Sequence, residues 1–164
     1  MRPKPIIPRP GQESVWDYPR PPRLERVPEP IRILLGGQVL VDTTAAYRVL
    51  ETSHPPAYYL PEHDVAPGAL VPAGGGSVCE WKGPALYYDV VLGGRRAARA
   101  GWTYPAPLHQ FEAIAGHVAF YAGPMDGCFI GEERAEPQPG GFYGGWVTGR
   151  IAGPFKGEPG TGGW

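Results

Sequence analysis

Residues 47–65 read YRVLETSHPPAYYLPEHDV, and their pattern governs how the neighbouring segments are interpreted. The overlapping run TTAAYRVLET is rich in Thr, Tyr and Val and lacks a polar stripe at helical spacing, so a strand is favoured over a helix. Ser53 to Pro56 stop that strand, and AYYL resumes as a second strand before Pro61. The stretch therefore predicts two strands that turn on each other at a proline corner.

Two tight hairpins are expected on either side of this unit. IRILL and QVLVD are joined by Gly36-Gly37, and PALYYDVVL and RRAARAGWTY are joined by Gly93-Gly94. Glycine pairs supply the positive φ angles of such turns. Gly36-Gly37 could also begin a phosphate-binding loop, but the Lys and Ser/Thr of that motif are missing and no helix follows. In the second hairpin, a period of two places four side chains on one face: Leu86, Tyr88, Val90 and Leu92.

The remaining segments are short and separated by turn signals. Pro72 and Gly74 to Gly76 indicate a loop, LHQFEAI predicts one helical turn that ends at Gly116, and HVAFYA predicts a strand with Val118 and Phe120 inward. Turns about every ten residues with almost no helical periodicity predict an all-β fold. We expect a sandwich or a small two-sheet open barrel with at most one short helix.

Composition narrows the class of protein. The chain has 164 residues and a net charge of -1, which suits one domain and gives no global reason to expect nucleic acid or an anionic membrane as partner. The absence of a long apolar run predicts a soluble, cytoplasmic protein without a signal peptide. Cys79 and Cys128 are too few for a disulfide scaffold and are expected as free thiols.

Glycine and proline divide the chain into three parts. Nine of the 22 prolines lie within residues 1–30, and ten of the 25 glycines lie between Gly140 and Gly163. We expect a Pro-rich N-terminal arm (1–30), an all-β domain (31–136) and a C-terminal arm rich in Gly and aromatic residues (137–164). Because disordered tails are poor in aromatics, residues 13–26 are expected to lie extended along the domain or a partner subunit; a mobile linker is the alternative.

Several motifs together resemble a known family. VLVDTTAAYRVLETSHPPAYYLPEHDV, CEWKGPALYYDV, GWTYPAP and IAGHVAFY closely resemble domain-of-unknown-function family 427, small bacterial, actinobacterial and fungal proteins. ESVWDYPRPP and PGGFYGGWVTGRIAGPFKG are similar to the arms of its extended members. The resemblance implies a compact, tent-like antiparallel fold with a ligand pocket between two sheets. It implies no activity, because the family has none that can be carried over.

Two kinds of chemistry associated with this resemblance find no support in the residues. Some relatives of the tent-like architecture hold zinc on paired CxxC motifs, but the two cysteines here are isolated, so neither a metal nor a cofactor is expected. The family is sometimes placed under a nucleotidyltransferase heading, and that chemistry needs clustered acidic residues to hold Mg²⁺. Gly76-Ser77 is followed by Val78, Cys79 and Glu80, with no Asp pair.

The strongest argument for a binding site is the set of aromatic residues at strand positions, because flat amphipathic rings hold sugars, nucleobases and other planar ligands. We expect a small-molecule-binding module for a polar or planar ligand. The side chains expected to line its pocket are Arg48, Glu51, Tyr59, Lys82, Trp102 and Tyr104. Arg48 and Glu51 fall on opposite faces of a regular strand, and a structural Arg–carboxylate pair is the alternative role for Arg48.

Two other classes of function stay open. An enzyme, either a hydrolase or a transferase, would use Glu51 with His54, or Cys79 as a nucleophile activated by the nearby Lys82. Packing is the ordinary role of a lone cysteine and is the alternative role for Cys79. The third class is an interaction protein, a homodimer in which the Pro- and Gly-rich arms wrap a second subunit.

Overall fold

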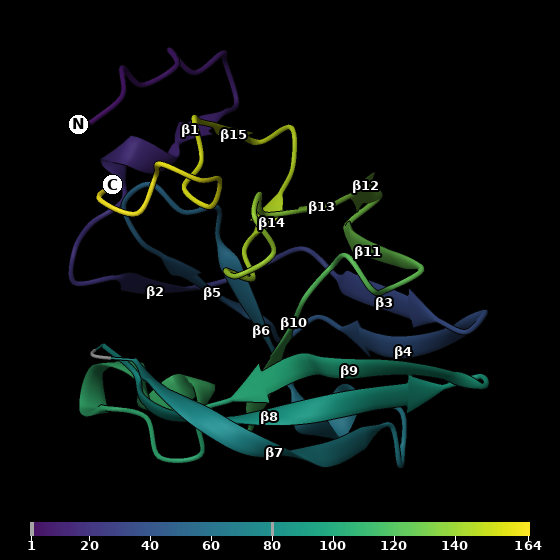
Figure 1. Ribbon diagram of the computed structural model, residues 1–164. Helices are drawn as coiled ribbons and strands as arrows, with labels where there is room; N and C mark the ends of the chain where they lie inside the picture. Colours follow the sequence, from purple (N-terminus) through teal and green to yellow (C-terminus); the bar gives the residue numbers. More distant parts are fainter. Residues whose placement is uncertain (1, 80) are drawn as a thin grey trace.

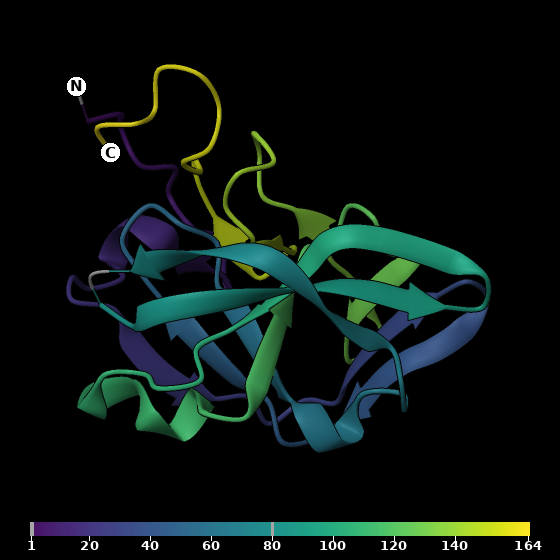
Figure 2. The same cartoon turned by 60° about the horizontal axis from the view of Figure 1, so that its bottom comes forward.

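The computed structural model describes residues 2–79 and 81–164, and strands dominate it (Figures 1 and 2). The all-β prediction is confirmed. The helical segments of the described chain are three short 3-10 helices, η1 (Val15–Asp17), η2 (Glu62–Asp64) and η3 (His109–Ile114). The longest, η3, is the helical turn that the sequence predicts, and Gly116 follows it with a φ of 74°. In this part of the chain no helix has the length and apolar character needed to cross a bilayer.

The larger sheet contains the strand pair of residues 47–65. Its strand order is β2 (Arg23–Arg26), β5 (Tyr47–Leu50), β6 (Ala57–Pro61), β10 (His117–Phe120), β9 (Arg95–Thr103), β8 (Gly83–Leu92) and β7 (Leu70–Cys79). β5 and β6 pair antiparallel, with Tyr47 opposite Tyr59, so the proline segment between them is a hairpin connection. This sheet is strongly bent, and β7, β8 and β9 form the lower layer of Figure 1.

A four-stranded sheet packs against the larger one. Its order is β12 (Glu133–Arg134), β11 (Gly127–Ile130), β3 (Ile31–Leu35) and β4 (Gln38–Thr43). Both predicted glycine turns are present, with φ of 60° and 74° at Gly36 and Gly37, and 57° and 76° at Gly93 and Gly94. The two turns touch, because a β-carbon on Gly36 would overlap the backbone of Leu92 and Gly93. The tips of the β3–β4 and β8–β9 hairpins are therefore packed backbone against backbone.

The two arms pack on the chain's own domain and on each other. β1 (Glu13–Ser14) pairs parallel with β15 (Ile151–Ala152), and β13 (Glu136–Pro137) pairs with β14 (Trp146–Val147). The indole Nε1 of Trp16 donates to the carbonyl of Pro154 at 2.9 Å. Figure 1 places the two ends of the chain close together above the sheets.

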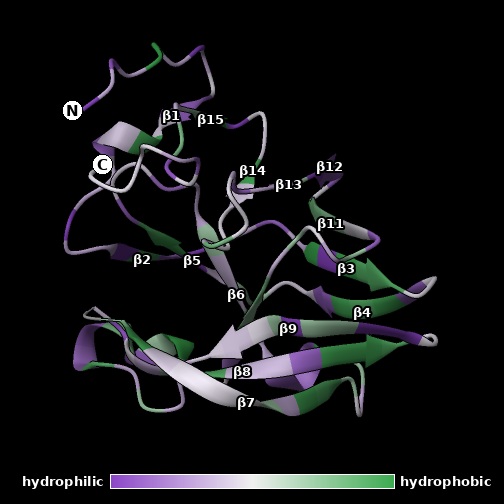
Figure 3. Cartoon of the chain, in the orientation of Figure 1, coloured by the Kyte–Doolittle hydropathy of each residue, from purple (hydrophilic) through white to green (hydrophobic). Residues whose placement is uncertain are grey.

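Buried apolar side chains form three clusters. The main core lies between the two sheets and includes Ile31, Ile33, Val90 and Phe120. Figure 3 shows the hydrophobic colour on β3 and β4 and on the ends of β7 and β8 that lie below them. A small third cluster under the arms is built around Trp16. The second cluster is mostly aromatic and is described below, because it lines a cavity.

One local prediction is wrong. Pro72 and Gly74 to Gly76 do not form a separate loop; they lie within β7, where a bulge between Pro72 and Gly76 absorbs the extra residues and the ladder to β8 then resumes. Leu86 is on the same face of β8 as Val90 by alternation, yet it is 49% exposed. Alternation along β8 defines its two faces, but it does not say how far the opposing sheet extends, and Leu86 lies beyond that cover.

Candidate functional site

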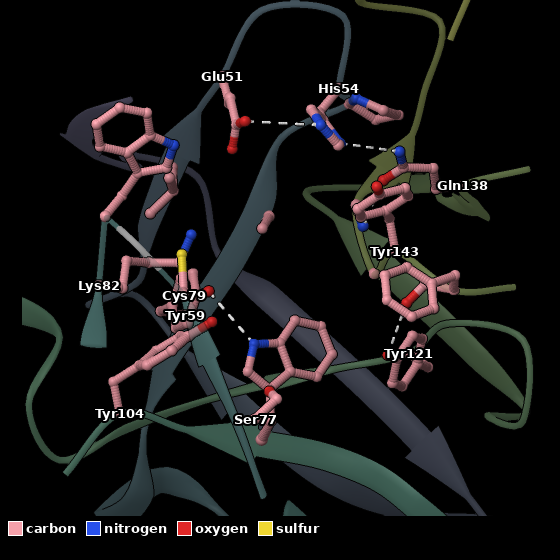
Figure 4. Close-up of a pocket in the computed structure, with 18 of the residues that line it drawn as sticks. Glu51, His54, Tyr59, Ser77, Cys79, Lys82, Tyr104, Tyr121, Gln138 and Tyr143 are labelled. Carbon is pink, nitrogen blue, oxygen red and sulfur yellow. Dashed lines mark hydrogen bonds and ion pairs between the residues drawn. The ribbon is translucent and has the colours of Figure 1, made fainter. Parts of the chain in front are cut away.

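An open cavity of about 440 Å³ lies between one face of the larger sheet and the C-terminal arm (Figure 4). Strands β5 to β9 supply its sheet side. The segment from Gln138 to Gly145, together with Lys156, supplies the opposite side. Residues far apart in the sequence therefore meet here, and we call this space the aromatic cavity.

The sheet side of the cavity is a cluster of aromatic rings. Tyr59, Trp102 and Tyr104 are all buried, with exposures of 1%, 8% and 7%. The Trp102 indole Nε1 donates to the Tyr59 hydroxyl at 3.3 Å, and the two rings meet edge to face with centroids 6.4 Å apart. The ring of Tyr121 packs on that of Trp102, with centroids 4.8 Å apart. Burial raises the pKa of Tyr59 and of Tyr104 well above the usual tyrosine range, so both present neutral hydroxyl groups to the cavity.

His54 is held in one tautomer on the upper rim of the cavity. The Gln138 side-chain amide donates to His54 Nδ1 at 3.1 Å, and the orientation of that amide is fixed because its oxygen accepts from the Gly145 N–H at 3.0 Å. The ring proton is therefore on Nε2, which faces the Glu51 carboxylate at 3.7 Å. Nδ1 thus accepts from Gln138 and Nε2 carries the proton, which leaves His54 poorly placed to act as a general base.

The charge of His54 is determined by burial and by nearby cations. Burial lowers its pKa to about 4, helped by the positive charges of Lys156, Arg20 and Lys82. The imidazole is consequently neutral at pH 7, and the rim carries Lys82, Lys156 and Glu51 as its charged groups.

The two lysines approach the cavity from opposite sides. Lys82, in the turn before β8, is 8% exposed and its Nζ lies 5.6 Å from the centroid of the Tyr104 ring. Lys156 of the C-terminal arm has its Nζ 5.4 Å from the centroid of Tyr143. Each ammonium group is therefore positioned by an aromatic face that also belongs to the cavity wall.

The C-terminal arm is fixed to the domain by buried contacts. Trp146 is 1% exposed, and its indole Nε1 donates to the carbonyl of Phe120 at 2.9 Å. Within the arm, the buried Gln138 donates to the carbonyl of Lys156 at 2.8 Å. Tyr143 lies edge-on to His54 with ring centroids 4.7 Å apart. The C-terminal arm is therefore held in place as part of the cavity wall.

The structure brings together most of the residues expected in the site. Glu51, Tyr59, Lys82, Trp102 and Tyr104 all line the aromatic cavity, as do His54 and Cys79. Sequence reasoning missed the contribution of the arm, namely Gln138, Phe142, Tyr143 and Lys156. The signal for it is the aromatic content of PGGFYGGW, which is unusual for a linker.

Arg48 lies elsewhere. On β5 the side chains alternate, so Val49 faces the aromatic cavity and Arg48 faces the opposite side of the sheet. There its guanidinium holds both oxygens of Glu13, at 2.9 and 3.1 Å, and Glu25 at 2.7 Å. The Arg–carboxylate pair considered from the sequence therefore exists, with Glu13 and Glu25 as partners in place of Glu51.

The two cysteines have different surroundings. Cys79, at the end of β7, is half-buried in the cavity wall. Cys128, on β11, is buried in the main core, and burial raises the pKa of its thiol to about 12. Within the described residues, no group of three or more His, Cys, Asp and Glu side chains is arranged to hold a metal ion.

Comparison with known proteins gives a family. No curated protein matches the chain. The family model described as "Domain of unknown function (DUF427)" matches residues 23–131, which run from the start of β2 to just past β11. The match includes the sheet side of the aromatic cavity and leaves out the C-terminal arm that forms its other side. Since the model covers more than half of the chain, the protein belongs to the DUF427 family.

Proposed function

We propose that the protein binds a small planar molecule carrying polar groups in the aromatic cavity. One observation carries this proposal: eight aromatic side chains of the described residues, from separate parts of the chain, converge on one open space of about 440 Å³ without filling it. They are Tyr59, Trp81, Tyr87, Trp102, Tyr104, Tyr121, Phe142 and Tyr143. A volume of about 300–1,000 Å³ with mainly aromatic walls and a few polar groups is usual for small-molecule sites.

The rim supports polar groups on the ligand. Lys82 and Lys156 can donate to an acceptor or an anion, and Glu51 can accept from a donor. Placing these groups around flat rings selects a ligand that has a planar body and hydrogen-bonding substituents.

The proposal can be tested with planar fragments and two matched variants. Isothermal titration with indole, quinoline and 2-naphthol should give binding to the wild type. Trp102→Leu should weaken that binding by about tenfold or more, because stacking on one aromatic ring contributes on the order of 1–3 kcal/mol. The control is Tyr88→Leu, since Tyr88 lies on the main-core face of β8 and its neighbour Tyr87 on the cavity face. Unchanged affinity in a folded Trp102→Leu protein would refute the proposal.

An enzymatic use of the same cavity could depend on Cys79, because its thiol is in the cavity wall and Lys82 lies in that wall as well. Alkylation of the native protein with iodoacetamide, followed by peptide mass spectrometry, distinguishes this alternative. Rapid modification of Cys79 would support it. An inert Cys79 would leave the binding role alone.

A further inference from the structure

A second cavity of about 400 Å³, which we call the annex, adjoins the aromatic cavity. The two spaces share four wall residues, Tyr87, Tyr121, Gln138 and Tyr143. The Tyr121 hydroxyl donates to the Phe142 carbonyl at 2.9 Å, which connects the end of β10 to the arm loop. A molecule that lies on Trp102 and extends past these shared side chains would therefore enter the annex.

Among the described residues, Arg99 is the only charged residue in the annex wall. It lies in a bulge of β9, where Tyr88 pairs with Gly101 and Val90 pairs with Ala97, so that three residues of β9 face Asp89 alone. Its φ is 50°, an unfavourable value for a residue with a β-carbon. The Asp89 Oδ1 atom stabilises this conformation by accepting from the Arg99 N–H at 2.8 Å. Bulges of this kind redirect a side chain.

The redirected side chain is held on the ring that divides the two spaces. The Arg99 guanidinium carbon lies 4.3 Å from the centroid of Tyr87, and one of its Nη atoms donates to the carbonyl of Gly74. The Tyr87 hydroxyl is itself hydrogen-bonded to Ser77 Oγ at 2.9 Å. Arg99 is therefore ordered against a shared wall, although the residue is exposed to solvent.

The local charge in the annex is positive. The nearby carboxylate is that of Asp89, and its Oδ2 atom accepts from the Arg96 guanidinium at 2.7 Å. Arg96 therefore neutralises the charge of Asp89, and the positive charge of Arg99 is not cancelled by that carboxylate. A planar guanidinium is the side chain best suited to bind a carboxylate or phosphate through two hydrogen bonds.

We propose that the ligand is a planar aromatic acid long enough to span both cavities. Its ring lies in the aromatic cavity, and its acidic side arm extends past Tyr121 into the annex and is bound by Arg99. This inference rests on the proposed function, since it needs the ring to occupy the aromatic cavity. It adds that the ligand is negatively charged and that its acidic group lies in the annex.

The test compares one ring with and without an acidic arm. Isothermal titration would use 2-naphthol, 2-naphthoate and 3-(2-naphthyl)propanoate with four proteins: wild type, Arg99→Gln, Arg99→Lys and Arg95→Gln. At least one acid should bind the wild type more tightly than 2-naphthol does. Arg99→Gln should lower that acid's affinity by about tenfold and leave 2-naphthol unchanged. Arg99→Lys, which keeps the charge, should recover part of the loss, and the neighbouring Arg95→Gln should have no effect.

The outcomes separate the two proposals. If 2-naphthol binds but no acid gains affinity from Arg99, the annex inference is overturned and the proposed function stands. An equal loss for 2-naphthol and for the acids in Arg99→Gln, with melting temperature unchanged, would also overturn it, because Arg99 would then act on the ring site. If none of the three compounds binds the wild type, both proposals fail.

Discussion

Gly144 of the C-terminal arm lies directly against the indole ring of Trp102, so closely that a β-carbon at position 144 would overlap the ring. The next residue, Gly145, is equally confined, because a β-carbon there would overlap the carbonyl of Pro55 and the side chain of Gln138. Two consecutive glycines thus allow the arm backbone to form one side of the aromatic cavity. The position of the arm and the shape of the cavity are consequently coupled.

Gly144→Ala should displace the arm from Trp102. Because overpacking a closely packed site usually costs about 1–3 kcal/mol, the melting temperature should fall and the affinity for 2-naphthol should fall with it. Gly163→Ala is the matched control, since a β-carbon there meets open space and its φ is not in the left-handed region. Calorimetry and titration of both variants check the prediction, and a Gly144→Ala protein with wild-type stability and affinity would refute the coupling.

The contact between the two hairpin tips gives a second prediction. Gly36 and Gly37 both have positive φ, but a β-carbon on Gly36 would overlap the backbone of the facing turn, whereas one on Gly37 would meet nothing. Gly37→Ala should therefore cost only the conformational penalty of about 1–2 kcal/mol. Gly36→Ala should cost clearly more. Urea denaturation of the two single variants measures the difference, and equal losses would show that the hairpin tips do not support each other.

His54 should make the stability depend on pH. Its pKa of about 4 in the folded protein lies below the ordinary value of 6.5, so between these values the unfolded chain binds a proton that the folded chain does not. The stability is therefore complete above about pH 6.5 and is lost as the pH falls toward 4, by on the order of 3 kcal/mol. His54→Asn should flatten the profile of unfolding free energy over this window. A variant profile parallel to that of the wild type would contradict the buried, neutral state of His54.

Arg48 should contribute to stability by attaching the N-terminal arm. Arg48→Gln leaves the carboxylates of Glu13 and Glu25 without their shared cation, and the expected loss is about 2 kcal/mol. Arg23→Gln is the control, because its exposed pair with Glu25 at 3.2 Å should be worth less than about 1 kcal/mol. Chemical denaturation compares them, and similar losses in the two variants would contradict a special role for Arg48.

The same ion pair affects the response to acid. The hydrogen bond from Arg48 holds the pKa of Glu13 below its usual range. The stability from this pair is present above the pH at which an unfolded glutamate titrates and is lost as the pH falls through the lowered pKa. Arg48→Gln should therefore lose less stability on acidification than the wild type, in a range below the one in which His54 acts.

The sequence predicts the local strand units well because their signals are local. A glycine pair between two apolar runs leaves few alternatives to a hairpin, and Gly36-Gly37 and Gly93-Gly94 both form one. The glycine run of β7 misled the prediction, because glycine permits a bulge as readily as a loop. Only the pairing with β8 distinguishes the two, and that pairing depends on residues distant in the sequence.

The sequence predicted the types of residue in the site better than their arrangement in space. Tyr59, Lys82 and Trp102 could be selected because aromatic rings and charged groups are the side chains that hold a planar, polar ligand. The partners of Arg48 could not, because Glu13 reaches it only after the N-terminal arm folds back on the domain. In the same way Gln138 and Lys156 meet His54 only through the path of the C-terminal arm, for which no local pattern exists.

The proposed function requires a planar ligand to occupy the space between Trp102 and the C-terminal arm. A crystal structure of the wild-type protein soaked with 2-naphthol measures this directly. We predict electron density for the ring in the aromatic cavity, in contact with Trp102 and Tyr143, with the arm in the position it has in Figure 4. A soaked crystal in which 2-naphthol binds only outside that cavity, or in which the arm has moved to fill it, would contradict binding of a planar ligand in the aromatic cavity.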